Sequence, residues 1–155
     1  MKKLIMIMMF AMVGLGLAAC GNGTEDPAPT PTEDGVDYPV EYFGATVVSS
    51  NVDGNTVVLT VEGEGFYPMT AEVTFTDGVI TDFVVTDHSE SSAWGGELIE
   101  RGDMQSAIID AEDVSAIDFN DYAEVDADSR ATATVEALYD IALGAIEHFE
   151  AYYAD

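Results

Sequence analysis

The sequence predicts an α+β domain in which antiparallel hairpins are packed with one or two helices, the last of them a long C-terminal helix. Two Asp-Gly pairs, at residues 53–54 and 77–78, each separate two segments rich in β-branched residues. This pattern is typical of hairpins. Residues 131–153 instead repeat apolar side chains at helical spacing. Strands that are followed by helices indicate that sheet and helices form separate layers.

Each hairpin is expected to turn at its Asp-Gly pair, because these residues readily adopt the positive φ angles of a tight turn. In the second hairpin Ala71, Val73 and Phe75 alternate with polar residues. One face of the sheet is therefore apolar and must be covered. The expected strands are residues 46–52, 55–61, 70–76 and 79–86.

Two helices are expected to cover this face. The first is residues 97–111, which Gly102 interrupts, and the second is residues 131–153. Residues 110–128 form an acidic connection between them, and we interpret this as a solvated loop. Its cluster at Asp118 lacks the spacing and the glycine of an EF-hand calcium site. The core positions of the long helix are Val135, Leu138, Ala142, Ile146, Phe149 and Tyr153.

The chain begins with a pattern typical of a bacterial lipoprotein signal. Lys2 and Lys3 precede an apolar run, residues 4–17, that is too short for a stable membrane span. The run ends in Leu-Ala-Ala-Cys, which resembles a lipobox, so Cys20 is expected to become the lipidated first residue of the mature protein. The alternatives are an ordinary signal peptide with an incidental cysteine and an uncleaved anchor.

The segment after Cys20 is rich in Gly, Pro, Thr and acidic residues and has almost no large apolar side chains. Such a composition is typical of an extended, disordered tether. We therefore expect an extracytoplasmic protein that a lipid anchor attaches to the bacterial cell membrane. The expected parts are a signal peptide at residues 1–19, the lipidated cysteine and tether at 20–39, and a folded domain at 40–155.

The charge of the chain excludes some partners. Without residues 1–19, two basic residues, Arg101 and Arg130, stand against 30 acidic ones. Nucleic acid and anionic lipid headgroups would repel such a chain, so we exclude nucleic-acid binding and assign membrane attachment to the acyl chain. With one cysteine and two widely separated histidines, a zinc site is not expected either.

The strongest functional signal is the heptapeptide Asp-Ala-Asp-Ser-Arg-Ala-Thr at residues 126–132. Ser129 is the expected N-cap of the long helix, with Asp128 as the competing choice. Thr132 then lies in the first turn, where backbone amides lack intrahelical partners and carry partial positive charge. A phosphate fits such a position without a cluster of basic side chains. The alternative is a capped helix start with a spare threonine.

Residues 63–153 resemble the FMN-binding domain of subunits in sodium-pumping quinone reductases and related redox complexes, which also occurs in surface lipoproteins. The family's attachment motif is Asp-x-x-Ser/Thr-Gly-Ala-Thr, and its loop His-x-Glu-Thr-Pro-Gly-x-Gly resembles residues 88–95. Residues 63–70 and 72–82 follow the family's hairpin. The attachment motif matches at Asp126, Ser129, Ala131 and Thr132 but not at Arg130, and the loop matches at His88, Glu90 and Gly95.

The resemblance implies that FMN is the cofactor and that Thr132 receives it through a phosphoester. A separate flavin transferase would read the residues around Thr132. The loop from His88 to Gly95 would lie beside the flavin, where Trp94 either stacks on the ring or acts as a packing plug. Arg130 has two interpretations, as a cation that serves the phosphate or as an obstacle to attachment.

These observations predict a lipid-anchored extracytoplasmic flavoprotein that carries electrons between a membrane partner and an unknown redox partner. It is more an electron carrier than a stand-alone enzyme, because the flavin performs the redox chemistry and needs no catalytic base. The alternative is a non-redox surface lipoprotein that retains the fold without the cofactor.

Overall fold

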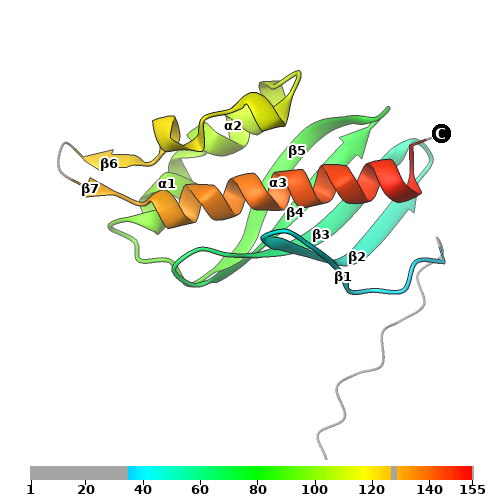
Figure 1. The fold of residues 1–155 in the computed structure, drawn as a ribbon, viewed down its shortest axis with the longest axis horizontal. Helices are drawn as coiled ribbons and strands as arrows, with labels where there is room; N and C mark the ends of the chain where they lie inside the picture. The colour runs from blue at the N-terminus through cyan, green and yellow to red at the C-terminus, as the bar shows by residue number, and fades with distance from the viewer. Residues whose placement is uncertain (1–34, 127–128, 155) are drawn as a thin grey trace, which may run out of the picture.

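The computed structural model describes residues 35–126 and 129–154, with the side chains of Asp126 and Ser129 left out. The predicted lipidation site, Cys20, lies outside these residues, as does Asp128. Five antiparallel strands form one sheet in the order β1-β2-β3-β4-β5 (Figure 1). Its strands are β1 Val40–Tyr42, β2 Ala45–Asp53, β3 Thr56–Glu64, β4 Pro68–Thr76 and β5 Val79–His88.

The second half of the described chain is mainly helical. A two-stranded sheet, β6-β7, immediately precedes the last helix, and two short 3-10 helices lie before it. These elements are α1 Gly95–Arg101, α2 Asp103–Asp110, η1 Val114–Ala116, η2 Phe119–Tyr122, β6 Glu124–Asp126, β7 Ser129–Arg130 and α3 Thr132–Tyr152. The predicted α+β class is confirmed.

Both predicted hairpins are confirmed, with longer strands than expected. Gly54 turns the first at φ 62°, and the second turns at Asp77 and Gly78, which have φ angles of 52° and 82°. The short strand β1 was not expected from the sequence. It pairs Val40 with Val47 on the free side of β2.

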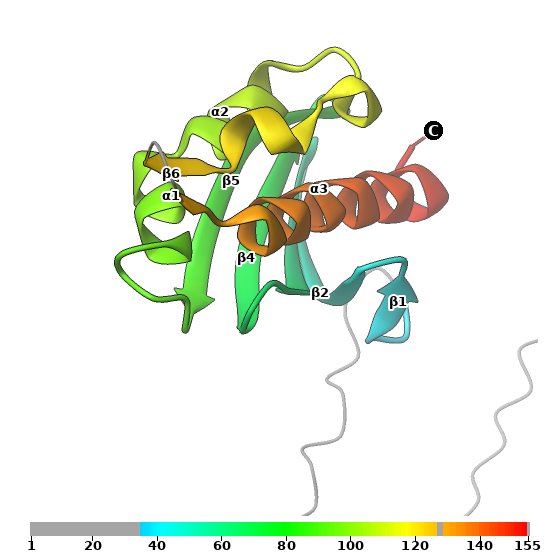
Figure 2. The same cartoon turned by 60° about the vertical axis from the view of Figure 1, so that its left-hand side comes forward.

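The helices cover one face of the sheet, as Figure 2 shows from the side. The predicted inward residues of β4, Ala71, Val73 and Phe75, are buried. The rings of Phe75 and Phe149 stack with centroids 4.4 Å apart, joining the sheet to the far end of α3. From the helices, the buried side chains include Leu98, Met104, Ile108, Val135, Leu138, Ile141, Ala142 and Ala145.

The expected helix at residues 97–111 is two helices, α1 and α2. Gly102 has a left-handed φ of 69°, ends α1 and donates its N–H to the Leu98 carbonyl at 3.3 Å. The same residue is the N-cap of α2. The single helix was therefore wrong, and the glycine that seemed only to interrupt it is the point where the chain changes direction.

The expected N-cap of the long helix, Ser129, was also wrong. Ser129 lies in β7, and the cap is Ala131, with no side-chain capping hydrogen bond. The cause is the β6-β7 pairing, which extends into a hydrogen bond from the Ala131 N–H to the Ala123 carbonyl at 2.9 Å. Pairing holds Ser129 extended, and the helix begins three residues later.

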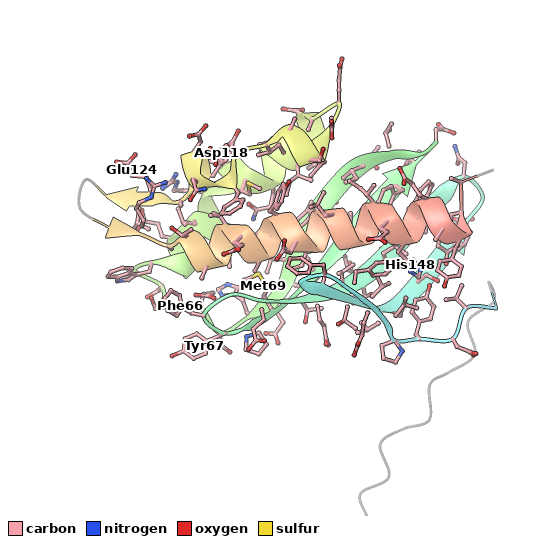
Figure 3. The ribbon with its side chains drawn as sticks, in the orientation of Figure 1. Phe66, Tyr67, Met69, Asp118, Glu124 and His148 are labelled. Carbon is pink, nitrogen blue, oxygen red and sulfur yellow. The ribbon has the colours of Figure 1, made fainter. Side chains whose placement is uncertain are left out.

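The packed part of the chain begins before residue 40. Tyr38 is buried, and its hydroxyl lies 3.0 Å from Nε2 of the fully buried His148. The hydroxyl of Tyr42 lies 2.9 Å from Nδ1 of the same ring. The segment at the N-terminal side of the domain is thus joined to the C-terminal half of α3, where Figure 3 labels His148.

Among the residues that the structure describes, no helix combines the length and apolar character needed to cross a membrane. Asp113 and Asp118, in the acidic connection, accept backbone N–H bonds at the starts of η1 and η2. The same described residues contain no group of three or more His, Cys, Asp or Glu side chains able to hold a metal ion.

Candidate functional site

The start of α3 presents unused backbone amides. Thr132 is its first residue and is half-buried. The N–H groups of Thr134 and Val135 both point to the Ala131 carbonyl, at 3.1 and 3.4 Å. The amides of Thr132 and Ala133 precede these and have no intrahelical acceptor by helix geometry. None of the described side chains caps this first turn and none of its residues is acidic, so the described part of this helix start suits an anion.

Arg130 lies in β7, opposite Glu124 of β6. Its side chain is exposed, and its guanidinium donates a hydrogen bond to the carbonyl of Asn120 in η2. The extended backbone of a strand accommodates any side chain, so glycine is not required here by its φ angle. The structure thus gives Arg130 a role that neither sequence interpretation contained, as a brace between β7 and η2.

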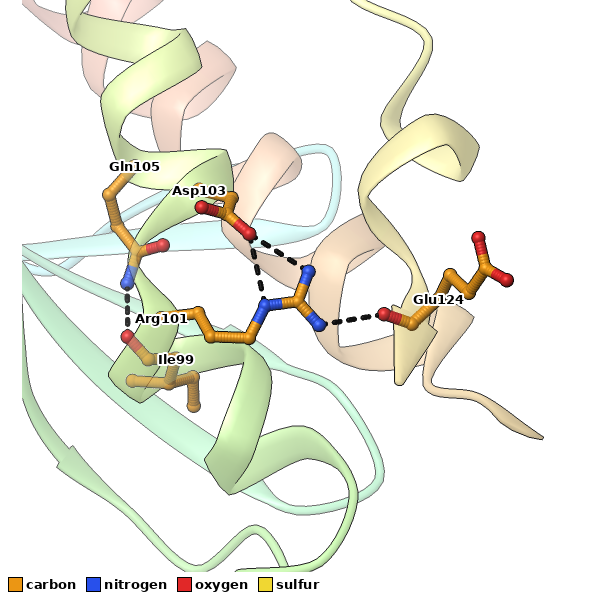
Figure 4. A network of polar contacts seen from close by, with 5 residues as sticks. All are labelled: Ile99, Arg101, Asp103, Gln105 and Glu124. Atoms are coloured by element: carbon orange, nitrogen blue, oxygen red, sulfur yellow. Dashed lines mark hydrogen bonds and ion pairs between the residues drawn. The ribbon is translucent and has the colours of Figure 1, made fainter. Parts of the chain in front are cut away.

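Arg101 forms a second brace at the same end of the molecule. It pairs with Asp103 at 2.8 Å and also donates to the Glu124 carbonyl at 2.8 Å (Figure 4). The junction of α1 and α2 is thereby tied to β6. Both of these arginines therefore support the β6-β7 hairpin, which carries Asp126 and Ser129 immediately before the helix start.

Glu90 lies at the centre of the site and is only 9% exposed. Its Oε1 accepts the backbone N–H groups of Phe66 and Tyr67, at 3.0 and 3.2 Å. These two residues belong to the turn between β3 and β4, which is 24 residues earlier in the chain. A buried carboxylate requires such donors, and here they are backbone groups of the turn.

Two glycines allow the backbone to come close to this carboxylate. A Cβ on Gly65 would lie 2.7 Å from Glu90 Oε1 and 3.4 Å from the Ala133 carbonyl oxygen. A Cβ on Gly95 would lie 2.5 Å from Glu90 Oε2 and 2.4 Å from the hydroxyl oxygen of Thr134. The turn, the loop and the first turn of α3 therefore meet at Glu90.

Two polar atoms of this region are buried without a partner. The Thr134 hydroxyl and the His88 Nδ1 form no hydrogen bond with any of the residues described. Both are unusual, since buried polar groups are normally bonded. His88 ends β5 opposite Met69 and begins the segment that the sequence predicted to lie beside the flavin. Trp94, at the N-cap of α1, is half exposed and is therefore not a buried packing plug.

A groove of about 730 Å³ lies on the other side of the Gly65 turn. Four carboxylates line it, which makes it unsuitable for a phosphate. Burial, and then the neighbouring Glu136, raises the pKa of the Asp140 carboxyl above its usual value. An anionic ligand is therefore better received at the start of α3 than in this groove. The four carboxylates are Glu41, Glu62, Glu64 and Asp140.

The α+β fold places the start of α3 beside the turn at Gly65 and the loop at Glu90, and the partial positive charge of a helix start suits an anionic group. The family model of the FMN-binding domain matches residues 65–147, which is more than half of the chain. The chain belongs to this family, and it is a flavin-binding protein whose cofactor is FMN. Searches of curated proteins and of solved structures give no match.

The described residues fit this cofactor. FMN carries a phosphate, for which the uncapped, acid-free first turn of α3 is suited. The match begins at Gly65 and includes Glu90, Gly95 and Thr132. The sequence did not indicate Phe66, Tyr67 or Thr134 as parts of the site. A signal for the first two was present in Phe-Tyr beside Gly65, but their link to Glu90 is a contact in space only.

Proposed function

We propose that this protein is a lipid-anchored, extracytoplasmic electron carrier whose FMN is joined by a phosphoester to the Thr132 hydroxyl. The observation that carries the proposal is the start of α3. In a chain with 30 acidic residues, the first turn of its longest described helix contains none, and no described side chain caps it. A covalently held phosphate at Thr132 supplies the missing negative charge.

The residues of the chain have distinct tasks in this proposal. The Thr132 hydroxyl forms the ester, and the amides of Thr132 and Ala133 donate to the phosphate oxygens. The loop from His88 to Gly95 contacts the flavin. Arg101 and Arg130 bond to backbone carbonyls of the segment that leads into α3. When bound, the flavin supplies one- and two-electron chemistry.

The electron partners follow from location and charge. We propose that a membrane partner reduces the flavin and that a second partner reoxidises it. The strongly acidic domain favours a partner with a basic docking surface, because complementary charge speeds encounter. Lipidation of Cys20 would keep the domain near the membrane partner. A Cys20→Ser variant should accordingly move from the membrane fraction to the soluble fraction.

The covalent bond is tested by the intact mass of the chain after co-expression with a flavin transferase and denaturation. The wild type should carry the mass of FMN minus one water, and Thr132→Ala should lose it. Thr132→Ser, which keeps a hydroxyl, should retain part of it. Thr86→Ala removes an exposed threonine of β5 and is the matched control. A wild-type chain without the increment contradicts covalent attachment.

Arg130→Gly restores the family's residue at the position that departs from the motif. The Arg130 guanidinium bonds to the Asn120 carbonyl, and the Arg130 backbone is extended. We therefore expect that Arg130 does not obstruct attachment of FMN to Thr132. The variant should therefore have a flavin content similar to that of the wild type. Flavin that appears only in Arg130→Gly would show that arginine is the obstacle and favour the non-redox alternative for the natural chain.

A further inference from the structure

We propose that the turn containing Phe66 and Tyr67 forms one wall of the flavin-ring site, with Trp94 on the other side. We further propose that Glu90 is the positioning residue that holds this turn. The inference rests on the proposed placement of the FMN phosphate at the start of α3. In this proposal the buried Glu90 carboxylate does not contact the ring but holds the turn that does.

The first observation is the exposure of three aromatic side chains. Phe66, Tyr67 and Trp94 are 72%, 52% and 50% exposed. Single exposed aromatics are ordinary, but these come from two segments that meet at one carboxylate. In Figure 3, Phe66 and Tyr67 lie at the end of the molecule where α3 begins. An apolar group bound between them would remove a large area from water.

The second observation is how the turn is held. Two backbone N–H groups of the turn donate to Glu90 Oε1. With these bonds made, Glu90 fixes the direction in which the Phe66 and Tyr67 side chains leave the backbone. Its other oxygen lies toward Gly95, the residue after Trp94. One carboxylate thus holds the turn of Phe66 and Tyr67 and lies close to the segment that carries Trp94.

The third observation is that both aromatic segments lie next to the first turn of α3, which begins at the proposed attachment residue, Thr132. The Gly65 position faces the Ala133 carbonyl, and the Gly95 position faces the Thr134 hydroxyl. Both contacts are with the first turn of α3, directly after Thr132. The two segments that carry the aromatic side chains therefore flank the helix start at which the phosphate would be held. The unpartnered Thr134 hydroxyl is buried beside Gly95 in the same first turn.

The chemistry of the flavin suits such walls. Its ring system is flat and electron-poor, so it stacks on aromatic faces and buries them. A tyrosine or tryptophan in contact with the excited ring donates an electron to it, and this quenches flavin fluorescence. Fluorescence per bound flavin consequently reports contact with the walls, independently of any redox activity.

The test uses the full chain in two preparations, one flavinylated by co-expression with a transferase and one titrated with free FMN. Tyr67→Ala should keep the covalent mass increment but show higher fluorescence per flavin, whereas Phe66→Ala, which removes no electron donor, should keep both the increment and the wild-type fluorescence. Their dissociation constants for free FMN should rise roughly fivefold each. Phe43→Ala is the matched control, because Phe43 is an exposed aromatic of the β1–β2 turn. Far-ultraviolet circular dichroism checks folding.

Glu90 is tested by a pair of variants. Glu90→Gln keeps an acceptor oxygen for the two N–H groups and should retain the wild-type fluorescence. Glu90→Leu removes the acceptor and should raise the fluorescence as Tyr67→Ala does. Equal changes in both would assign Glu90 a role through its charge and overturn its positioning role.

The outcomes separate this inference from the proposed function. A wild type that binds FMN, with fluorescence unchanged in Tyr67→Ala and affinity for free FMN unchanged in Phe66→Ala, overturns the aromatic walls alone. A wild type that binds no FMN in either preparation overturns the placement of the cofactor, and the inference with it. An equal loss of affinity for free FMN in Phe43→Ala would overturn the assignment of the walls to this turn.

Discussion

Arg130 stands where the attachment motif of the family has glycine, and the structure shows why an arginine is tolerated there. The residue lies in an extended strand, and its guanidinium reaches away along the hairpin to the carbonyl of Asn120. Arg101 makes an equivalent bond to the carbonyl of Glu124. Two of the few cations of this acidic chain thus satisfy backbone oxygens near the motif.

Asp140 is a residue whose ionisation should destabilise the fold. Burial first, and Glu136 second, raises the pKa of its carboxyl above 3.8. A raised pKa means that the stability given by the protonated form is complete below the unfolded pKa. This contribution is lost as the pH rises through the folded pKa. At neutral pH the Asp140 carboxylate is therefore less stable in the folded protein than in the unfolded chain, where water solvates it.

Asp140→Asn should accordingly raise the free energy of unfolding at pH 7. The gain should shrink as the pH falls toward 3.8, where the wild-type carboxyl is increasingly protonated. Urea denaturation at several pH values measures this difference. Glu150→Gln, at an exposed position of the same helix, controls for the change in net charge. A gain that stays constant with pH would contradict the ionisation argument.

At the level of helices and strands, the periodic patterns of the sequence predicted the hairpins and the long helix. The alternation of Ala71, Val73 and Phe75 with polar residues, and the Asp-Gly turns, identified the hairpins. The helical repeat from Val135 to Phe149 identified α3 and its buried side. These signals are reliable because burial of one face selects the spacing directly.

Ser129 was wrongly predicted as the cap of α3 because a strand pairing, which is not a local signal, sets where the helix begins. Capping preference is a local signal worth about 1 kcal/mol, and a strand pairing overrides it easily. That pairing joins Ala131 to Ala123, with β6 between the two in the sequence. The short strand β1 and the bonds from Glu90 to the turn at Phe66 are likewise products of tertiary contact. Neither leaves a periodic trace in the sequence.

The break between α1 and α2 depends on one backbone conformation. Gly102 has a φ of 69°, and a Cβ there would meet open space, so only the backbone conformation opposes a side chain. Gly102→Ala should lower the free energy of unfolding by about 1 kcal/mol, because alanine disfavours the left-handed region. Urea denaturation measures the loss, with Ser106→Ala in α2 as the control. Unchanged stability would contradict the role of this glycine.

In the whole molecule, the contacts of His148 join the two ends of the described chain. The hydroxyls of Tyr38 and Tyr42 meet its two ring nitrogens, and Tyr38 also lies 3.2 Å from the Tyr153 hydroxyl. Tyr38→Phe removes a buried hydrogen-bonding group and should lower the free energy of unfolding by about 1 kcal/mol.

Chemical denaturation of the full chain measures this effect. Tyr152→Phe, which removes a hydroxyl from an exposed side chain of the same helix end, should change stability by less than about 0.5 kcal/mol. Equal losses in the two variants would show that the Tyr38 hydroxyl contributes nothing specific. The sequence did not predict this contact, because Tyr38 lies in a segment whose composition is that of a tether.

The position of His148 also determines how the domain bears a mechanical load. Tension applied to the chain before residue 35 would enter the fold through Val36 and Tyr38, and the Tyr38 hydroxyl would pass it to the C-terminal half of α3. Thr132 lies at the other end of this helix, 16 residues or about 24 Å along its axis. Such a load would therefore strain the contacts of Val36 and the tyrosine–histidine contacts before those near Thr132. The segments that meet at Glu90 stay outside the path of that force.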